Sequence, residues 1–160
     1  MVRNGIGFDV HPFAPDRKLI LGGVEIAYEK GLLGHSDADV VCHAIADALL
    51  GAAGLGDIGM MFPDTDPRYS GFSSLLLLQK VAERLQKEGF QIGNVDITII
   101  AQEPKIGAYS EMMRTNISSM IGLGEEMVNI KGKTTEALGF IGRKEGIAAL
   151  AIATLSKDEF

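Results

Sequence analysis

The sequence contains a single cysteine, Cys42. One cysteine cannot form an intramolecular disulfide or a thiolate cluster around zinc, so disulfide-rich secreted mini-domains and zinc fingers are both excluded. Any metal ion bound by this chain must therefore use histidine and carboxylate ligands.

Long apolar runs and runs of basic residues are also missing. The most apolar stretches, around residues 75–78 and 147–155, fall short of the ~20 residues that a bilayer-spanning helix needs. The amino-terminal segment lacks the apolar core of a signal peptide. The net charge is −6 and no basic run occurs, which argues against nucleic acid or a membrane as a partner. We expect a soluble, cytoplasmic protein.

The composition is that of one globular domain. The chain has 160 residues, of which 46% are hydrophobic and 22% charged, values that exclude extensive disorder. Its 20 glycines are spread along the chain and separate the expected elements. We therefore expect a single domain over residues 1–160.

Hydrophobic periodicity predicts alternating strands and helices. Strands are expected at residues 5–10, 95–101, 128–131 and 146–155, and a bent pair of short strands at 19–27, interrupted by Gly22 and Gly23. Helices are expected from Asp37 onward, with Ser36 or Asp37 as N-cap, and at residues 73–88 and 107–121. Periodicity leaves 146–155 open between strand and helix, and the lack of charge favours a strand. The fold class is α+β: a two-layer sandwich of a mixed four-stranded sheet with helices on one face.

Asp9 and His11 are candidate metal ligands. Residues i and i+2 of a strand point to the same face, so both side chains can reach one ion. Catalytic zinc takes three protein ligands, and His43 on the first helix can supply the third. Asp39 and Asp47, four residues to either side, could hold its other ring nitrogen. Alternatively, His11 caps a turn before Pro12 and the helix carboxylates are simply solvated.

Three further segments carry polar side chains that suit a phosphorylated ligand. His35 and Ser36 follow a glycine-containing turn at a helix amino end, which offers free N–H groups to phosphate. Lys105 stands between a strand and a helix and could contact phosphate. In the run from Lys133 to Glu136, hydroxyls and a carboxylate could hold phosphate and Mg²⁺. Each has a plainer alternative: an N-cap, a surface lysine and a capping sequence.

A fourth segment, residues 56–67, is an acidic loop. Its aspartates could bind sugar hydroxyls, although turn formation alone also selects Asp, Gly and Pro.

Together these motifs resemble the 2-C-methyl-D-erythritol 2,4-cyclodiphosphate synthases of the non-mevalonate isoprenoid pathway. The resemblance runs from Gly5 to about Ile152, through GFDVH, KGLLGHSDADV, FPDTDP, NVDITIIAQEPK, KTTEALGF and GRKEGIA. It implies a phosphorus–oxygen lyase that converts 4-diphosphocytidyl-2-C-methyl-D-erythritol 2-phosphate to the cyclodiphosphate and releases CMP. It also implies a homotrimer with active sites between subunits.

The resemblance also implies roles for individual residues. Zn²⁺ or another divalent transition metal would bind Asp9, His11 and His43, and Glu136 would ligate Mg²⁺ or Mn²⁺. The catalytic positions would be His35 and Thr134. The substrate-binding positions would be Ser36, Asp57, Ile58, Gly59, Phe62, Pro63, Asp64, Thr65, Asp66, Ala101, Gln102, Glu103, Pro104, Lys105, Ile106, Gly107, Lys133, Thr135, Phe140 and Arg143.

Two positions depart from the family pattern. Lys133 stands where the family usually has threonine, which adds positive charge beside a diphosphate, and Ala38 stands where it often has glycine, which we expect to be neutral. Two other functions remain open from the residues alone: a metal-dependent phosphohydrolase and a non-catalytic nucleotide-binding module.

Overall fold

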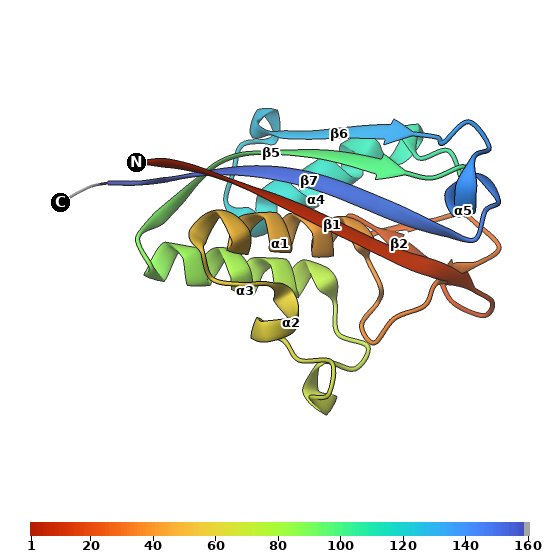
Figure 1. Cartoon of the computed structure of the whole chain (residues 1–160), viewed down its shortest axis with the longest axis horizontal. Helices are drawn as coiled ribbons and strands as arrows, with labels where there is room; N and C mark the ends of the chain where they lie inside the picture. Colours follow the sequence, from red (N-terminus) through yellow and green to blue (C-terminus); the bar gives the residue numbers. More distant parts are fainter. Residues whose placement is uncertain (159–160) are drawn as a thin grey trace.

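The computed structural model describes residues 1–158, which form a five-stranded sheet covered on one face by helices and a separate two-stranded sheet. The five-stranded sheet has the order β4-β1-β7-β5-β6. Strands β1 (Val2–Ala14), β7 (Gly146–Lys157) and β5 (Phe90–Ile100) are successively antiparallel, whereas β6 (Val128–Lys133) runs parallel to β5. Helices α1 (Val40–Ala53), α3 (Ser74–Lys87) and α4 (Ser110–Ile121) form the second layer (Figure 1). The α+β class, the mixed sheet and the one-sided helices are confirmed.

The sheet has one more strand than the predicted four. Strand β4 (Gly31–Leu32) is only two residues long and pairs with the end of β1, where Phe13 lies opposite Leu32. So short a strand carries no alternation of polar and apolar residues, which is why the pattern gave no sign of it. The expected hairpin is present as β2 (Leu19–Leu21) and β3 (Val24–Ile26), joined by Gly22 and Gly23, which have φ of 54° and 71°.

Strand β7 pairs along almost its whole length with β1 on one side and with β5 on the other. Residues 146–155 therefore form a strand, as favoured, and their continuous apolar character reflects burial in the centre of the sheet. Strand β1 extends well beyond the predicted residues 5–10 because β7 offers it hydrogen-bond partners from Val2 to Pro12.

Helix α1 begins later than predicted. Its N-cap is Asp39, whose side chain accepts hydrogen bonds from the backbone N–H groups of Val41 and Cys42. Ser36 and Asp37 precede the helix and use their side chains elsewhere. Residues 107–109 form a 3₁₀ turn before α4, and the acidic loop contains a short helix, α2 (Ile58–Met61), and a 3₁₀ turn at Pro67–Tyr69.

Two glycines bring α1 unusually close to β1. A Cβ atom on Gly7 would lie 1.9 Å from the carbonyl oxygen of Ala44, and one on Gly5 would lie 2.0 Å from that of Ala48. Gly5 and Gly7 share the helix-facing side of β1 with Asp9. This close approach places the side chains of α1 within reach of those of β1.

The opposite face of the sheet is not covered by helices and is partly apolar. Ile6 is 66% exposed, Phe8 54% and Ile152 47%. Ile6 and Ile152 are direct cross-strand partners, so the exposed apolar side chains form a continuous stripe over β1 and β7.

Among residues 1–158, no helix combines the length and the apolarity that crossing a membrane requires.

Candidate active site

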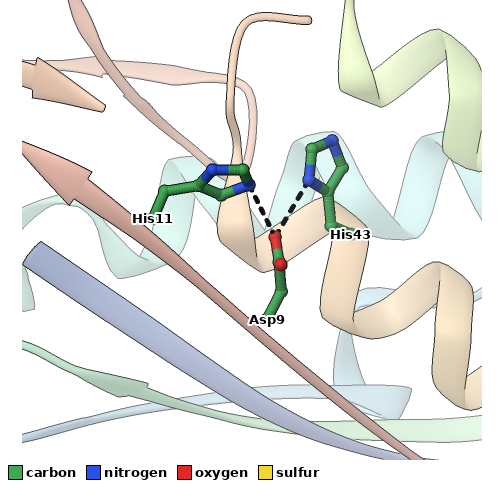
Figure 2. Close-up of side chains that lie close together, drawn as sticks. All are labelled: Asp9, His11 and His43. Carbon is green, nitrogen blue, oxygen red and sulfur yellow. Dashed lines mark hydrogen bonds and ion pairs between the residues drawn. The ribbon is translucent and has the colours of Figure 1, made fainter. Parts of the chain in front are cut away.

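Asp9, His11 and His43 meet where β1 passes the first turn of α1 (Figure 2). Asp9 Oδ2 lies 3.0 Å from His11 Nε2 and 3.0 Å from His43 Nδ1. One ligand atom from each residue falls within 4.8 Å of the others. Tetrahedral zinc with bonds of about 2.0 Å has ligand atoms about 3.3 Å apart. The three side chains therefore fit a divalent metal with small adjustments.

The two histidines favour the ionised form of Asp9, which is the form that can bind a metal ion. Burial raises the pKa of Asp9, but hydrogen bonds from His11 and His43 and the charges of both rings outweigh burial and hold that pKa well below its usual range. The hydrogen bond to Asp9 raises the pKa of His11, against the opposing effect of burial. Asp9 is thus ionised at neutral pH, and His11 must lose its Nε2 proton to bind metal.

The second nitrogen of His11 is held by the backbone. His11 Nδ1 lies 2.7 Å from the carbonyl oxygen of Leu33. Because a carbonyl oxygen only accepts, Nδ1 carries a hydrogen, and once Nε2 has lost its own proton, Nε2 is the nitrogen with a lone pair for a metal ion.

The expectation that Asp39 or Asp47 holds the second nitrogen of His43 is wrong. Asp39 accepts hydrogen bonds from the backbone N–H groups of Gly22 and Gly23 as well as from α1. Asp47 accepts one from the N–H of Ile58. Helical spacing places these carboxylates near His43, but unpaired backbone donors at a helix start and a loop compete for them.

His43 Nε2 instead faces two serines. Ser74 Oγ, on the first residue of α3, lies 2.9 Å away and Ser36 Oγ 3.2 Å away. Ser74 was not identified from the sequence, because its contact with His43 joins residues 31 positions apart.

The triad opens into a cavity of about 380 Å³. The structure brings His35 and Ser36 to this cavity together with part of the acidic loop. The loop residues that line it are Ile58, Gly59, Phe62, Pro63 and Asp64. Tyr69 and Leu77 also line it and were missed. Tyr69 stacks edge-on against Phe62 at 5.3 Å between ring centroids, a contact that sequence spacing does not reveal.

Three predicted acidic-loop positions do not line this cavity. Asp57 caps α2 by accepting a hydrogen bond from the N–H of Met60 at 2.9 Å. Asp66 is paired with Arg68 at 2.6 Å, and Thr65 is exposed. For Asp57 and Asp66, turn formation and capping account for the carboxylates without a ligand.

A second cavity, of about 530 Å³, lies at the ends of β5 and β6. It is lined by Ile99, Gly132 and the predicted residues Ala101, Gln102, Glu103, Pro104, Lys105, Ile106, Gly107, Lys133 and Thr134. None of these residues lines the first cavity. The two groups of predicted site residues therefore lie in different cavities of one chain.

The remaining predicted residues follow Thr134 in an exposed loop and in the short helix α5 (Gly139–Gly142), which has Arg143 as its C-cap. Glu136 has φ of 53° and its carboxylate accepts a hydrogen bond from Thr134 Oγ1 at 3.2 Å. The loop is tied to the second cavity by the N–H of Ala137, which donates to Gln102. Thr135 Oγ1 donates to the Leu138 carbonyl. Phe140 is 45% exposed and Arg143 is paired with Glu145.

Comparison with known proteins gives consistent matches. The model of the YgbB family matches residues 2–156. The 2-C-methyl-D-erythritol 2,4-cyclodiphosphate synthase of Enterococcus faecalis is 56% identical over 157 residues, which are 98% of this chain and 100% of the relative.

Two solved structures have the same fold. The bifunctional IspDF from Campylobacter jejuni matches with a TM-score of 0.95 and 45% identity, over 99% of this chain and 43% of that longer one. IspF from Plasmodium falciparum, solved as a CDP complex, matches with a TM-score of 0.86 and 37% identity, over 99% of this chain and 97% of that chain.

Proposed function

The chain belongs to the YgbB family, and from that premise we propose that it converts 4-diphosphocytidyl-2-C-methyl-D-erythritol 2-phosphate to 2-C-methyl-D-erythritol 2,4-cyclodiphosphate and CMP. The observation that carries the proposal is the position of His35 and Ser36 beside Asp9, His11 and His43 in one cavity. This arrangement would place hydrogen-bond donors for a phosphate next to a metal ion held by three protein ligands.

The reaction is an intramolecular phosphoryl transfer. An oxygen of the 2-phosphate forms a bond to the β-phosphorus, and the bond from that phosphorus to the bridging oxygen breaks. The leaving CMP keeps the electron pair, so no protein nucleophile is required. Because both phosphates are anionic, catalysis depends on folding the substrate back on itself and neutralising charge.

The protein side chains perform the positioning. Asp9, His11 and His43 would hold a divalent cation such as Zn²⁺, which supplies Lewis-acid stabilisation of phosphate charge. Ser36 and the loop from Ile58 to Asp64 would hold the erythritol end, and His35 would donate to a phosphate oxygen.

The second cavity is proposed as the cytidine site. Lys105 and Lys133 line it and would contact the phosphates, while Thr134 would stabilise the transferring phosphoryl group. Glu136 would ligate Mg²⁺ or Mn²⁺, since a carboxylate beside a diphosphate is tolerable when a cation lies between them. The similarity to an IspF solved with CDP supports the choice of ligand.

We also propose that the active site is shared between subunits of a homotrimer. The two cavities have no lining residue in common, and the apolar stripe of Ile6, Phe8 and Ile152 is exposed in the single chain. A contact through this face would bury the stripe. The cytoplasmic location stays a prediction from the sequence.

A single assay tests the proposed reaction. The protein is incubated with the diphosphocytidyl substrate, Zn²⁺ and Mg²⁺, and products are followed by phosphorus NMR. Cyclic diphosphate with CMP is expected. Linear phosphate products would indicate a phosphohydrolase, and absence of turnover a nucleotide-binding module; either result would overturn the proposal.

A further inference from the structure

Two polar side chains lie behind His43, on the side away from Asp9, and the proposed reaction does not use either of them. Figure 2 shows the His43 ring with one nitrogen toward Asp9 and the other directed away. The second nitrogen, Nε2, lies 2.9 Å from Ser74 Oγ, and Ser74 is only 1% exposed. Ser74 in turn contacts Asp37, which precedes α1. A buried contact of this kind leaves little room for water to replace it.

The direction of each hydrogen bond follows from counting protons. Asp37 Oδ2 accepts from the backbone N–H of Ser74 at 3.1 Å, and Oδ1 accepts from the N–H of Asp39 at 3.2 Å. Asp37 Oδ1 also accepts from the hydroxyl of Ser74. Because an ionised carboxylate has no hydrogen to give, the Ser74 hydroxyl must donate to Asp37.

The same count assigns the tautomer of His43. Once the hydroxyl hydrogen of Ser74 points to Asp37, only lone pairs of Ser74 Oγ face His43. His43 Nε2 must then carry a hydrogen, which it donates to Ser74, with Ser36 Oγ as a more distant acceptor at 3.2 Å. Nδ1 faces Asp9 Oδ2 at 3.0 Å. When a metal ion takes the place of the hydrogen between them, the neutral imidazole keeps its one ring hydrogen on Nε2 and has its lone pair on Nδ1.

We infer that Ser74 and Asp37 are positioning residues, which hold His43 with its hydrogen on Nε2 and its Nδ1 lone pair available to a metal ion. The inference deepens the proposed function, on which it rests for the role of the triad. The opposite tautomer would direct a hydrogen from Nδ1 into the space between the three ligand atoms and prevent metal binding. Partners of this kind fix ring orientation in other histidine metal sites.

A purely structural role for the same contacts makes a different prediction. Asp37 also joins the loop before α1 to the amino end of α3, where a carboxylate is favourable to the helix. If this were the whole role, loss of the Ser74 hydroxyl would lower the melting temperature and leave the metal affinity of the folded protein unchanged.

The first experiment compares Ser74→Ala with Ser73→Ala. Ser73 is the neighbouring serine and N-cap of α3, but its side chain makes no capping hydrogen bond. Zinc affinity is measured by competition with a chromophoric chelator, and the melting temperature is measured on metal-free protein. We expect Ser74→Ala to bind zinc about 10- to 100-fold more weakly and Ser73→Ala to bind it as the wild type does. Wild-type zinc affinity in folded Ser74→Ala would overturn the inference.

A second experiment uses the unsubstituted, zinc-loaded protein and so does not depend on the variant folding. Long-range ¹H–¹⁵N spectra of protein labelled at its three histidines report which ring nitrogen carries hydrogen, and a His43→Gln spectrum assigns the signals of His43. We expect hydrogen on Nε2, and hydrogen on Nδ1 would overturn the inference. If Nε2 carries hydrogen but the phosphorus NMR assay finds no cyclic product, the proposed function fails and the positioning role stands.

Discussion

At the scale of single residues, the site depends on one carboxylate oxygen that faces two imidazoles. Asp9 Oδ2 is 3.0 Å from a nitrogen of each ring, and each ring has its other nitrogen held by a separate partner, Leu33 for His11 and Ser74 for His43. Each side chain is therefore restrained at two points, which is the arrangement a metal site requires.

His43→Ala should abolish stoichiometric zinc binding. The change removes one of three ligands from a site that offers no fourth candidate close by among residues 1–158. Bound zinc in purified protein is measured by plasma mass spectrometry. The control is His35→Ala, which removes an imidazole from the same cavity but outside the triad and should retain zinc. A full equivalent of zinc on His43→Ala would show that the triad is not the binding site.

Protonation of the triad should make stability depend on pH in the metal-free protein. The pKa of His11 is raised above 6.5, so its contribution is present below that pH and is lost as pH rises through the folded pKa. The pKa of Asp9 is lowered from 3.8, so its contribution is lost as pH falls below that value. The melting temperature of the wild type should therefore exceed that of Asp9→Asn by more at pH 5.5 than at pH 8.5. An equal difference at both pH values would contradict the pairing, and zinc affinity should show the opposite trend, increasing with pH.

Glu136→Gln should impair metal use without destabilising the fold. Glu136 is exposed and its carboxylate contacts Thr134 rather than the core. We expect the free energy of unfolding to change by at most roughly 1 kcal/mol, while turnover falls and the required Mg²⁺ or Mn²⁺ concentration rises. Urea unfolding and metal-dependent kinetics check the two parts. A marked fall in stability with an unchanged metal requirement would identify Glu136 as a structural cap.

At the scale of elements, the packing of α1 on β1 decides whether the triad can assemble. Asp9 and His11 come from the strand and His43 from the helix. Gly5 and Gly7 allow the two backbones to approach closely enough for those side chains to meet.

Gly7→Ala should therefore damage both stability and metal binding. The new Cβ would lie 1.9 Å from the Ala44 carbonyl oxygen, so the helix must move away from the strand. We expect this movement to lower the free energy of unfolding by about 1–3 kcal/mol. Gly51→Ala is the matched control, because its Cβ meets only the Ile6 carbonyl oxygen at 4.0 Å and alanine favours helix. Unfolding and zinc titration of both variants check the prediction. Equal stability of the two would show that the close approach has no structural importance.

The segment that leads into α1 contains a residue in an unfavourable conformation. Ala38 is buried with φ of 59°, the left-handed region that favours glycine at a cost of roughly 1 kcal/mol to other residues. Contrary to our expectation, alanine is therefore not neutral at this position, because its backbone conformation is less favourable for alanine than for glycine. The strain lies between Asp37 and Asp39, two carboxylates that anchor this segment.

At the scale of the whole molecule, the separation of the two cavities predicts complementation between subunits. His43→Ala alters the first cavity, and Lys105→Glu places a negative charge in the second. Each variant alone should be inactive. If each site combines the cavities of two neighbouring chains, a trimer that contains both variants has one intact site of three and should recover about a third of wild-type activity.

Coexpression of the two variants with different tags, followed by purification through both tags, provides the mixed assembly. Light scattering should give three times the 17.1 kDa chain mass. Absence of recovered activity in verified mixed trimers would place each site within one chain, and a 17.1 kDa monomer would remove the shared-site proposal.

Local sequence patterns were sufficient to predict several strands and helices and part of the candidate site. Alternation on β1 placed Asp9 and His11 on one face, helical spacing predicted α1 and α3, and lack of charge favoured a strand for 146–155; the structure confirms each. The family resemblance, which the family model confirms, rested on motifs that lie in order along the chain. Such signals depend on residues close in sequence, whose relative positions the backbone geometry of a strand or helix sets.

Only the tertiary structure decided which groups face the triad and how the predicted site residues divide between cavities. Ser74 contacts His43 although the two residues are 31 positions apart in the sequence. Asp39 and Asp47 accept hydrogen bonds from backbone N–H groups of other segments instead of from His43. The extra strand β4 exists because the chain returns to the end of β1. These contacts depend on how the helices and strands pack together. They also depend on which polar groups are buried by that packing and so need hydrogen-bond partners, and neither can be predicted from sequence spacing.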